Sequence, residues 1–192
     1  MESSQQKILA YALKNALFDG WNTKLLENAS ESAGLDKNYH RILFPTGIVG
    51  LFAFFVEETN RKMAESLKLD GLRTHEKIKA CIIWRLEELK PHKQAIKALY
   101  KVLLLNPVET LKASYSAIDS MWRLAGDVST DFNFYSKRTI LAGVYSSTIW
   151  KFLDDDSENY SKTLAFLDNR LAEVGKFNKF MSGIKNKLKF AY

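Results

Sequence analysis

Apolar side chains recur every three or four positions along almost the whole chain, which is the spacing of one face of an α-helix. In residues 5–18, for example, Ile8, Ala12 and Leu13 fall on one side. No stretch shows the long apolar–polar alternation and tight turns of paired strands, and the chain has only three prolines and nine glycines. The sequence therefore predicts an all-α fold.

Capping residues, prolines and glycines divide this pattern into about nine helices followed by a C-terminal amphipathic helix. Gly20 and Gly34 suit helix ends, whereas a proline suits a first helical turn. The predicted helices begin near Gln5, Thr23, Asp36, Pro45, Thr74, Pro91, Pro107, Phe134 and Ser157. We expect three regions: residues 1–44, a helical core over residues 45–174, and a tail over residues 175–192.

Two core helices carry patterns that predict how they pack. The apolar stripe of the helix that begins at Pro107 is expected to be buried and consists of Leu111, Tyr115, Ile118 and Trp122. The next helix instead collects the small residues Ala142, Gly143, Ser146 and Ser147. Small side chains let another helix approach closely, which is compatible either with tight packing inside one subunit or with a dimer interface.

The tail has the pattern of a basic amphipathic helix. Its apolar residues are Val174, Phe177, Phe180, Met181, Ile184 and Leu188. Its lysines include Lys176, Lys179 and Lys185, and no acidic residue follows Glu173. Such a helix favours the interface of an anionic membrane. The alternative is a last helix that docks on the protein's own core.

The charge of the chain is concentrated in this tail. The net charge is +6, and five lysines follow Glu173, so residues 1–173 carry only +1. A near-neutral body is not typical of a domain that wraps nucleic acid. The single cysteine, Cys81, excludes an internal disulfide and suits a reducing compartment. The start of the chain lacks the pattern of a secretory signal or a transit peptide.

Residues typical of catalysis or metal binding are missing from the sequence. There is no phosphate-binding glycine loop, and none of His40, His75 and His92 lies in a zinc or di-iron motif. The run Asp154–Asp156 is interpreted as a solvated loop before a helix. We therefore predict no enzymatic activity, no catalytic residue, no metal and no cofactor.

The segment between Met121 and Arg138 carries more chemistry than a connector needs. Gly126 can end one helix, and Asp127, Ser129, Thr130 and Asp131 suit turns and caps. Three aromatic residues then follow within four positions: Phe132, Phe134 and Tyr135. They cannot all point inward from the start of one helix, so we expect part of this cluster to present a surface for a partner or ligand.

The N-terminal segment resembles the helix-turn-helix of TetR-type repressors, with Gly34 in the turn. Its second helix would offer Lys37, His40 and Arg41 to a DNA groove. Binding DNA normally requires several phosphate contacts, and the basic surface predicted here is too poor for that. We interpret the motif as degenerate, with a TetR-type transcriptional regulator as the alternative function.

Three further segments, read together, resemble the Coq-nine family of ubiquinone-biosynthesis proteins. They are Arg-Ile-Leu-Phe-Pro at 41–45, Arg-Leu-Glu-x-Leu-x-Pro-His at 85–92, and Met-Trp-x-x-Ala-Gly-Asp-x-Ser-Thr-Asp-Phe-Asn-Phe-Tyr-x-Lys-Arg at 121–138. Residues 153–170 add to the likeness, which covers about residues 4–174. The sequence departs from the family at Phe134, commonly Trp, and at Lys137, often Arg.

This resemblance implies a lipid-binding accessory protein without catalytic activity. Such proteins have a TetR-like helical fold, form homodimers, bind isoprenoid lipid in an apolar cavity and touch membranes through a C-terminal helix. They support the di-iron hydroxylase of demethoxyubiquinone by presenting its substrate. The partner-binding residues would be Met121, Trp122, Asp131, Phe134, Tyr135 and Arg138.

The resemblance also assigns a role to each region. Residues 45–174 become the lipid-binding and dimerisation core, and the bound molecule is expected to be an isoprenoid or a phospholipid. Residues 175–192 become the membrane-contacting tail. The expected location is the bacterial cytoplasm, peripheral on the inner membrane, or the mitochondrial matrix side for a processed eukaryotic form. No nucleic acid partner is expected.

Overall fold

The computed structural model describes the backbone of residues 3–130 and 132–189, and the side chains of residues 3–130 and 133–176. Every regular element in these ranges is helical, which confirms the all-α prediction. The elements are α1 (Ser4–Asp19), α2 (Thr23–Ser32), α3 (His40–Leu43), α4 (Ile48–Ser66), α5 (Thr74–Leu89), η1 (Lys90–His92), α6 (Lys93–Leu103), α7 (Pro107–Leu124), α8 (Phe132–Leu153), η2 (Glu158–Tyr160) and α9 (Ser161–Lys189).

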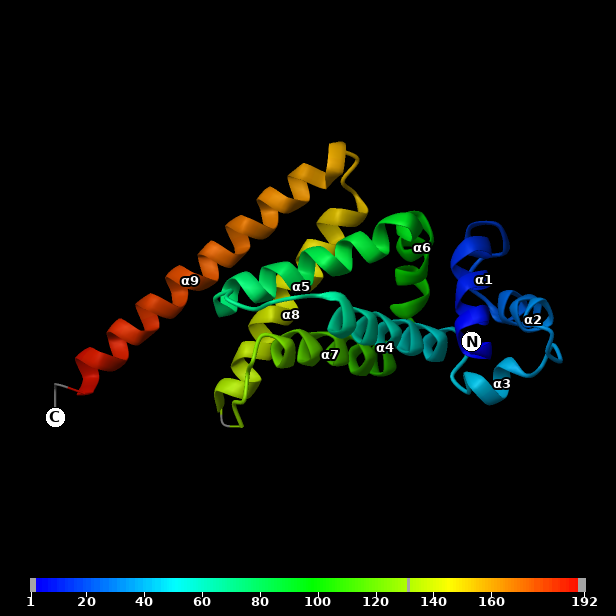
Figure 1. Ribbon diagram of the computed structural model, residues 1–192, viewed down its shortest axis with the longest axis horizontal. Coiled ribbons are helices and arrows are strands. Elements are labelled where there is room, and N and C mark those ends of the chain that lie inside the picture. The colour runs from blue at the N-terminus through cyan, green and yellow to red at the C-terminus, as the bar shows by residue number, and fades with distance from the viewer. Residues whose placement is uncertain (1–2, 131, 190–192) are drawn as a thin grey trace.

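The helices form an elongated body with α1–α3 at one end (Figure 1). The pair α4 and α7 lies side by side along the middle, and α8 crosses behind α5 and α7 to lead into α9. Helix α6 connects the two parts, because it packs on both α1 and α8. The indole Nε1 of Trp21 donates to the carbonyl of Ala95 at 2.8 Å and fixes the α1–α2 turn to α6.

A continuous apolar core runs through both parts. Its largest fully buried side chains are Ile8, Leu25, Leu26, Leu51, Met63, Ile82, Leu86, Leu99, Leu103, Met121, Ile149 and Phe152. Cys81 is buried in this core, and burial raises the pKa of its thiol to about 11. A thiol with so high a pKa is protonated at neutral pH and acts as a small apolar group.

Several predicted helix starts differ from the structure. Helix α8 begins at Phe132 rather than Phe134, and α9 begins at Ser161, after η2, rather than near Ser157. Helix α3 begins at His40 rather than Asp36, because residues 37–39 form turns. Helix α4 begins at Ile48 rather than Pro45, after Gly47 adopts a φ of 62° that ends the preceding turn. Pro91 lies in η1, so α6 begins two residues later, whereas Pro107 opens α7 as predicted.

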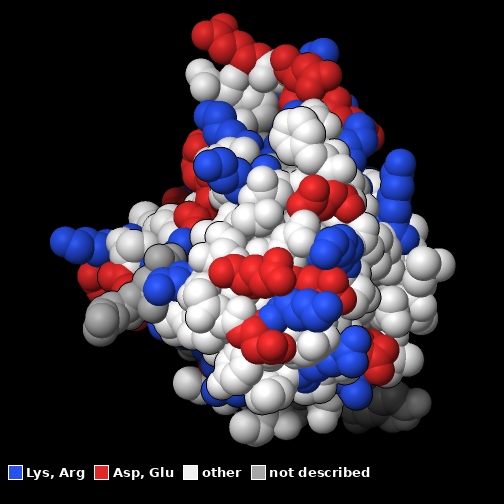
Figure 2. Space-filling model, turned by 90° about the vertical axis from the view of Figure 1, so that its right-hand side faces the viewer, with Lys and Arg blue, Asp and Glu red and all other residues white. Residues whose placement is uncertain are grey.

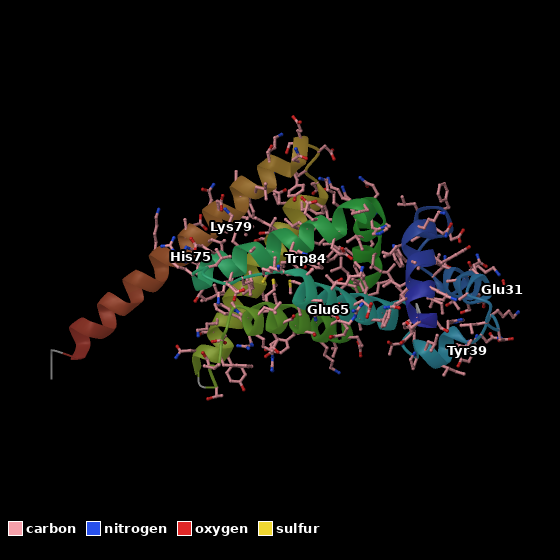
Figure 3. The ribbon with its side chains drawn as sticks, viewed as in Figure 1. Glu31, Tyr39, Glu65, His75, Lys79 and Trp84 are labelled. Atoms are coloured by element: carbon pink, nitrogen blue, oxygen red, sulfur yellow. The ribbon has the colours of Figure 1, made fainter. Side chains whose placement is uncertain are left out.

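The ninth helix and the tail were predicted as separate helices, and that division is wrong. Helix α9 is continuous from Ser161 to Lys189 and passes through Gly175 and Gly183 without a break. Its first half packs on α5 and α8, where Lys79 pairs with Asp168 (Lys79 is labelled in Figure 3). Its second half projects away from the body (Figure 1).

The acidic run before α9 matches the predicted solvated loop at Asp154 and Asp156, which are exposed, but not at Asp155. Asp155 is buried, and its carboxylate accepts from the backbone N–H of Thr163 at 2.7 Å and of Ser157 at 2.9 Å. Burial acts to raise the pKa of Asp155, but the hydrogen bonds from Ser157 and Thr163 outweigh it and hold that pKa well below the usual value. Asp155 therefore fixes the sharp entry into α9.

Candidate functional site

An apolar cavity of about 660 Å³ lies between α4, α5, α6, α7 and α8. This volume falls within the roughly 300–1,000 Å³ of sites that bind small organic ligands. Most of its wall is hydrocarbon, including Phe52, Phe55, Leu89, Ile96, Leu99, Leu103, Leu111, Ile118 and Ile149. An apolar molecule that enters would exchange water for hydrocarbon on nearly all of its surface, which is favourable.

The cavity explains why the apolar stripe of α7 is incompletely covered. Leu111 and Tyr115 were predicted to be buried, yet Leu111 is 70% exposed and Tyr115 is also exposed. Both residues line the cavity, whereas Ile118, one turn further along, is buried in its wall. The periodicity of α7 was therefore interpreted correctly as one face, but that face borders an open cavity rather than solid protein.

The small residues of α8 provide the space on the opposite wall. Ala142, Gly143 and Ser146 line the cavity, so they do not serve tight packing inside the subunit. A Cβ atom added at Gly143 would meet nothing within 4 Å. Large side chains at these positions would fill the space that α6 and α7 leave free. No second chain is present to test the dimer interface, which stays a prediction.

Exposed residues of the cavity wall lie at two places, around the turn between α6 and α7 and on the first turn of α8. Leu104, Leu111 and Tyr135 are strongly exposed and line the cavity at the same time. Leu105 and Val108 continue this exposed apolar rim beyond the wall.

Arg85 on α5 is among the most buried polar residues of the cavity wall, with 3% of its area exposed. Its Nε donates to the hydroxyl of Tyr145 at 2.9 Å, and its Nη1 donates to Oδ1 of Asn60 at 2.7 Å. The guanidinium carbon also lies 5.6 Å from the centre of the Tyr145 ring. Tyr145 and Tyr100 share this part of the wall, and burial raises the pKa of Tyr100 well above its usual value.

The connection between α7 and α8 is held by a charged network at one end of the cavity. Arg138, which is buried, donates to Oδ1 of Asp119 at 2.8 Å and to Oδ2 of Asp127 at 3.0 Å. Lys137 donates to Oδ1 of Asp127 at 2.7 Å and to the hydroxyl of Ser129 at 2.7 Å. Gly126, with a φ of 88°, supplies the left-handed turn that brings Asp127 back toward α8.

Ionised Asp127 is favoured strongly in this network. Burial alone would raise the pKa of Asp127, but hydrogen bonds from Lys137, Ser129 and Arg138 outweigh it and hold the pKa well below its usual value. The carboxylate is therefore charged at every physiological pH. Charge and hydrogen bonds together fix the loop that leads into the first turn of α8, which carries Phe134 and Tyr135.

The structure separates the predicted partner residues into two groups. Met121 is fully buried and Arg138 nearly so, so neither forms an exposed contact surface; both support it from beneath. Phe134 lies under the guanidinium of Arg138, whose carbon is 3.4 Å from the ring centre. Trp122 is half-buried, and its Nε1 donates to the carbonyl of Lys137 at 3.1 Å.

Tyr135 is the predicted partner residue that stands out from the surface, with 66% of its area exposed. Its ring meets the edge of Phe134 with centroids 5.1 Å apart. Val128 in the connecting loop is even more exposed and was not predicted. Asp131 lies outside the described residues.

The predicted membrane residues are described only in part. Lys176 is exposed on α9. Phe177, Phe180, Met181, Ile184, Leu188, Lys179 and Lys185 lie on the helical backbone of α9, and their side chains are outside the described set. Among the described residues, no helix is both long enough and apolar enough to cross a bilayer.

The N-terminal end of the molecule lacks the features of a DNA reader. Helix α3 is a single turn, and His40, predicted to face DNA, is buried with its Nδ1 2.8 Å from the carbonyl oxygen of Lys37. Acidic and basic side chains alternate over this end rather than forming one basic face (Figure 2). Glu31 and Tyr39 lie at its outer edge (Figure 3). These features do not favour DNA binding, and the degenerate character of the helix-turn-helix stays a prediction.

Metal chemistry finds no support among the described residues, which contain no group of three or more His, Cys, Asp or Glu side chains placed to hold an ion.

Two residues of the site were missed from the sequence, Arg85 and Asp127. Arg85 interrupts the apolar face of α5 four residues after Cys81, and a charge on a buried stripe is the signal that could have found it. Asp127 stood among turn residues and gave no such signal.

Comparison with known proteins gives consistent matches over this region and beyond. The COQ9 family model matches residues 108–178, which span α7, α8 and the first half of α9. The chain is 32% identical over 185 residues to "Ubiquinone biosynthesis protein COQ9, mitochondrial" of Bos taurus, and 31% identical over 185 residues to the protein of that name in Homo sapiens. It is 30% identical over 191 residues to "Probable ubiquinone biosynthesis protein coq9, mitochondrial" of Dictyostelium discoideum.

These matches cover most of the chain but less than two thirds of the length of each relative. They include 90% of the chain for the Bos taurus and Homo sapiens proteins and 93% for the Dictyostelium discoideum protein. The chain spans 58% of the length of the first two relatives and 62% of the third. The relatives therefore contain segments without a counterpart in the aligned part of this chain.

Proposed function

Because the chain belongs to the COQ9 family, which is the Coq-nine family that its motifs resemble, we propose that it is an accessory protein of ubiquinone biosynthesis. It binds an isoprenoid quinone precursor in the cavity and presents it to the di-iron demethoxyubiquinone hydroxylase. It makes and breaks no bond itself. Several of its relatives carry ubiquinone biosynthesis in their names, which supports the pathway.

The observation that carries this proposal is the apolar cavity of about 660 Å³ with an exposed apolar rim. An isoprenoid quinone is too apolar to diffuse through water, so a soluble enzyme can reach it only at a membrane or through a carrier. The walls of α6, α7 and α8 offer hydrocarbon contacts to the isoprenoid tail of such a molecule.

The position of Tyr135 supports the presenting role. Tyr135 lines the cavity and is also the exposed aromatic residue of the predicted partner surface. A partner that docks there would meet the mouth of the cavity directly. Exposed tyrosines are frequent anchors of protein interfaces, because they bury a large area at a small cost in side-chain entropy.

The tail supports a setting at a membrane surface. Beyond Glu173 the sequence is basic and amphipathic, and the backbone of α9 continues as a helix that projects from the body. Membrane contact, a homodimer and the absence of a resident cofactor are parts of this proposal. The relatives are named mitochondrial, and the location of this chain, bacterial or mitochondrial, stays a prediction.

A vesicle-extraction assay tests the proposal. The purified chain is incubated with uncharged vesicles that contain an isoprenoid quinone, because the tail is expected to hold the chain on anionic ones. The vesicles are then removed by flotation, and quinone absorbance is measured in the protein fraction. We expect up to about one bound quinone per chain. We also expect the hydroxylase to turn over its quinone substrate faster with this chain than without it. Protein fractions without quinone, at any vesicle composition, would contradict the proposal.

A further inference from the structure

We propose that Arg85, Tyr100 and Tyr145 form the head-group site of the cavity and select a lipid that carries an ionised oxygen. The proposal rests on the lipid-binding function above and adds the chemical class of the ligand. It begins from the charge of Arg85, which is buried in an apolar wall although buried charges are costly unless they are paired.

Arg85 is not paired with a carboxylate among the residues that the structure describes. Its two hydrogen-bond partners, Tyr145 and Asn60, are neutral. From Asn60 a chain of hydrogen bonds leads outward: its Nδ2 donates to the hydroxyl of Ser116 at 3.1 Å, and that hydroxyl donates to Glu57 at 2.5 Å. The nearest countercharge of this network is thus two side chains away, at the surface.

The same part of the wall has more hydrogen-bond donors than acceptors. Within the described residues, no hydrogen bond uses Nη2 of Arg85 or the hydroxyl of Tyr100. The Tyr145 hydroxyl accepts from Arg85 and keeps its own proton to donate. Three spare donors and one positive charge around an apolar cavity match a head group that brings oxygen acceptors and a negative charge.

The geometry also sets the direction of the ligand. Tyr135 and Tyr145 are ten positions apart on α8, which corresponds to about 15 Å along a helix. On α8 the wall between them consists of Arg138, Thr139, Ala142 and Gly143, and the charge of Arg138 is paired with Asp119 and Asp127. A head group at Arg85 therefore directs its tail toward the mouth at Tyr135, and the head must slide outward before a partner docked at the mouth can reach it.

Two sources offer the same chemistry, an ionised hydroxyl on a quinone ring and a phosphate group, and two matched probe pairs separate them. The first pair is a decyl-tailed hydroxybenzoquinone and the methoxy analogue that cannot ionise. The second pair is geranylgeranyl phosphate and geranylgeraniol. Affinities are measured for the wild-type chain and for Arg85→Met, which removes the charge and keeps an apolar side chain of similar length.

We expect the wild-type chain to prefer the ionised member of one pair by roughly tenfold or more, the scale of a hydrogen bond to a charged group. Arg85→Met should reduce this ratio to about one and leave the affinity for the neutral probes within roughly twofold. The pair that shows the preference identifies the source. Tyr100→Phe, which removes one donor and no charge, should lower the preference in part and provides a test if Arg85→Met does not fold.

Two results would overturn the inference while lipid binding stands: no preference in either pair, or a preference that survives both substitutions. An equal loss of all four probes in a folded Arg85→Met protein would also overturn it, because Arg85 would then shape the cavity rather than select the head group. If the wild-type chain binds none of the four probes, the lipid-binding function itself is wrong.

Discussion

The guanidinium of Arg138 lies 3.0 Å from the carboxylate of Asp127, and both side chains are almost inaccessible to solvent. This pair joins the loop after α7 to the second turn of α8. It stands between two parts of the proposed site, because Arg138 lines the cavity and also covers the ring of Phe134. The same contacts that order the loop therefore shape the cavity mouth.

Replacement of Asp127 by Asn tests the importance of this pair for folding. Asp127→Asn keeps the shape but leaves Arg138 with Asp119 as its remaining carboxylate. We expect the free energy of unfolding in urea to fall by about 2 kcal/mol, the scale of a hydrogen bond between charged groups. Asp70→Asn, at an exposed position of the α4–α5 loop, is the matched control and should change it by less than about 0.5 kcal/mol. Equal effects of the two substitutions would contradict the assignment.

The pKa of Asp127 predicts a pH dependence of stability. The folded-state pKa is lowered below the unfolded value of roughly 4, so the unfolded chain takes up the proton first. Stability should be fully present above about pH 4 and should decline as pH falls below it. Thermal unfolding between pH 2 and pH 7 measures this decline, which should be smaller in Asp127→Asn. An identical decline in both proteins would assign it to other carboxylates.

Tyr135 is the predicted anchor for the hydroxylase. We expect Tyr135→Ala to weaken binding by about 2 kcal/mol, or roughly 30-fold, because truncation of a central aromatic anchor has this effect. Circular dichroism should show unchanged helicity. Tyr39→Ala removes an exposed tyrosine at the opposite end of the molecule and should leave the affinity unchanged. If Tyr135→Ala binds the hydroxylase as tightly as Tyr39→Ala does, the docking surface lies elsewhere.

The tail is expected to bind anionic vesicles. Replacement of Lys176, Lys179 and Lys185 by Gln should weaken binding by about 1 kcal/mol per lysine. The same change at the exposed lysines Lys37, Lys68 and Lys112 serves as the control, since these lie away from the tail. Flotation assays compare both triple variants with the full chain and with residues 1–174. Equal flotation of the full chain and of residues 1–174 would exclude a membrane role for the tail.

The sequence predicted the helices better than it predicted how they meet. Periodicity and caps located α5 and α7 because their signals are local. The cavity was not visible in the pattern, since Leu111 and Tyr115 look the same on a helical wheel whether they face protein or open space. The small residues of α8 around Gly143 likewise suggested close packing with another helix. Only the positions of α6 and α7 reveal that these small residues leave space for the cavity.

The sequence also could not predict which residues of the predicted partner surface are buried. Met121 and Arg138 belong to the family-like motif together with Tyr135, and a motif does not distinguish residues that touch a partner from residues that support them. Asp155 shows the same limit. Three consecutive aspartates suggest a solvated loop. The carboxylate of Asp155 instead accepts a hydrogen bond from the backbone N–H of Thr163, which lies eight residues further along the chain.

The most direct test of the account is mass spectrometry of the lipid that co-purifies with the chain from cells that make isoprenoid quinones. The comparison includes Gly143→Leu, which places a side chain in the cavity, and Gly143→Ala, which adds the same gain in helix propensity with little volume. We predict an isoprenoid quinone or its precursor on the wild-type chain and on Gly143→Ala, and a loss of most of it from a folded Gly143→Leu protein. A wild-type chain without isoprenoid lipid, or the same amount on all three proteins, would contradict the account.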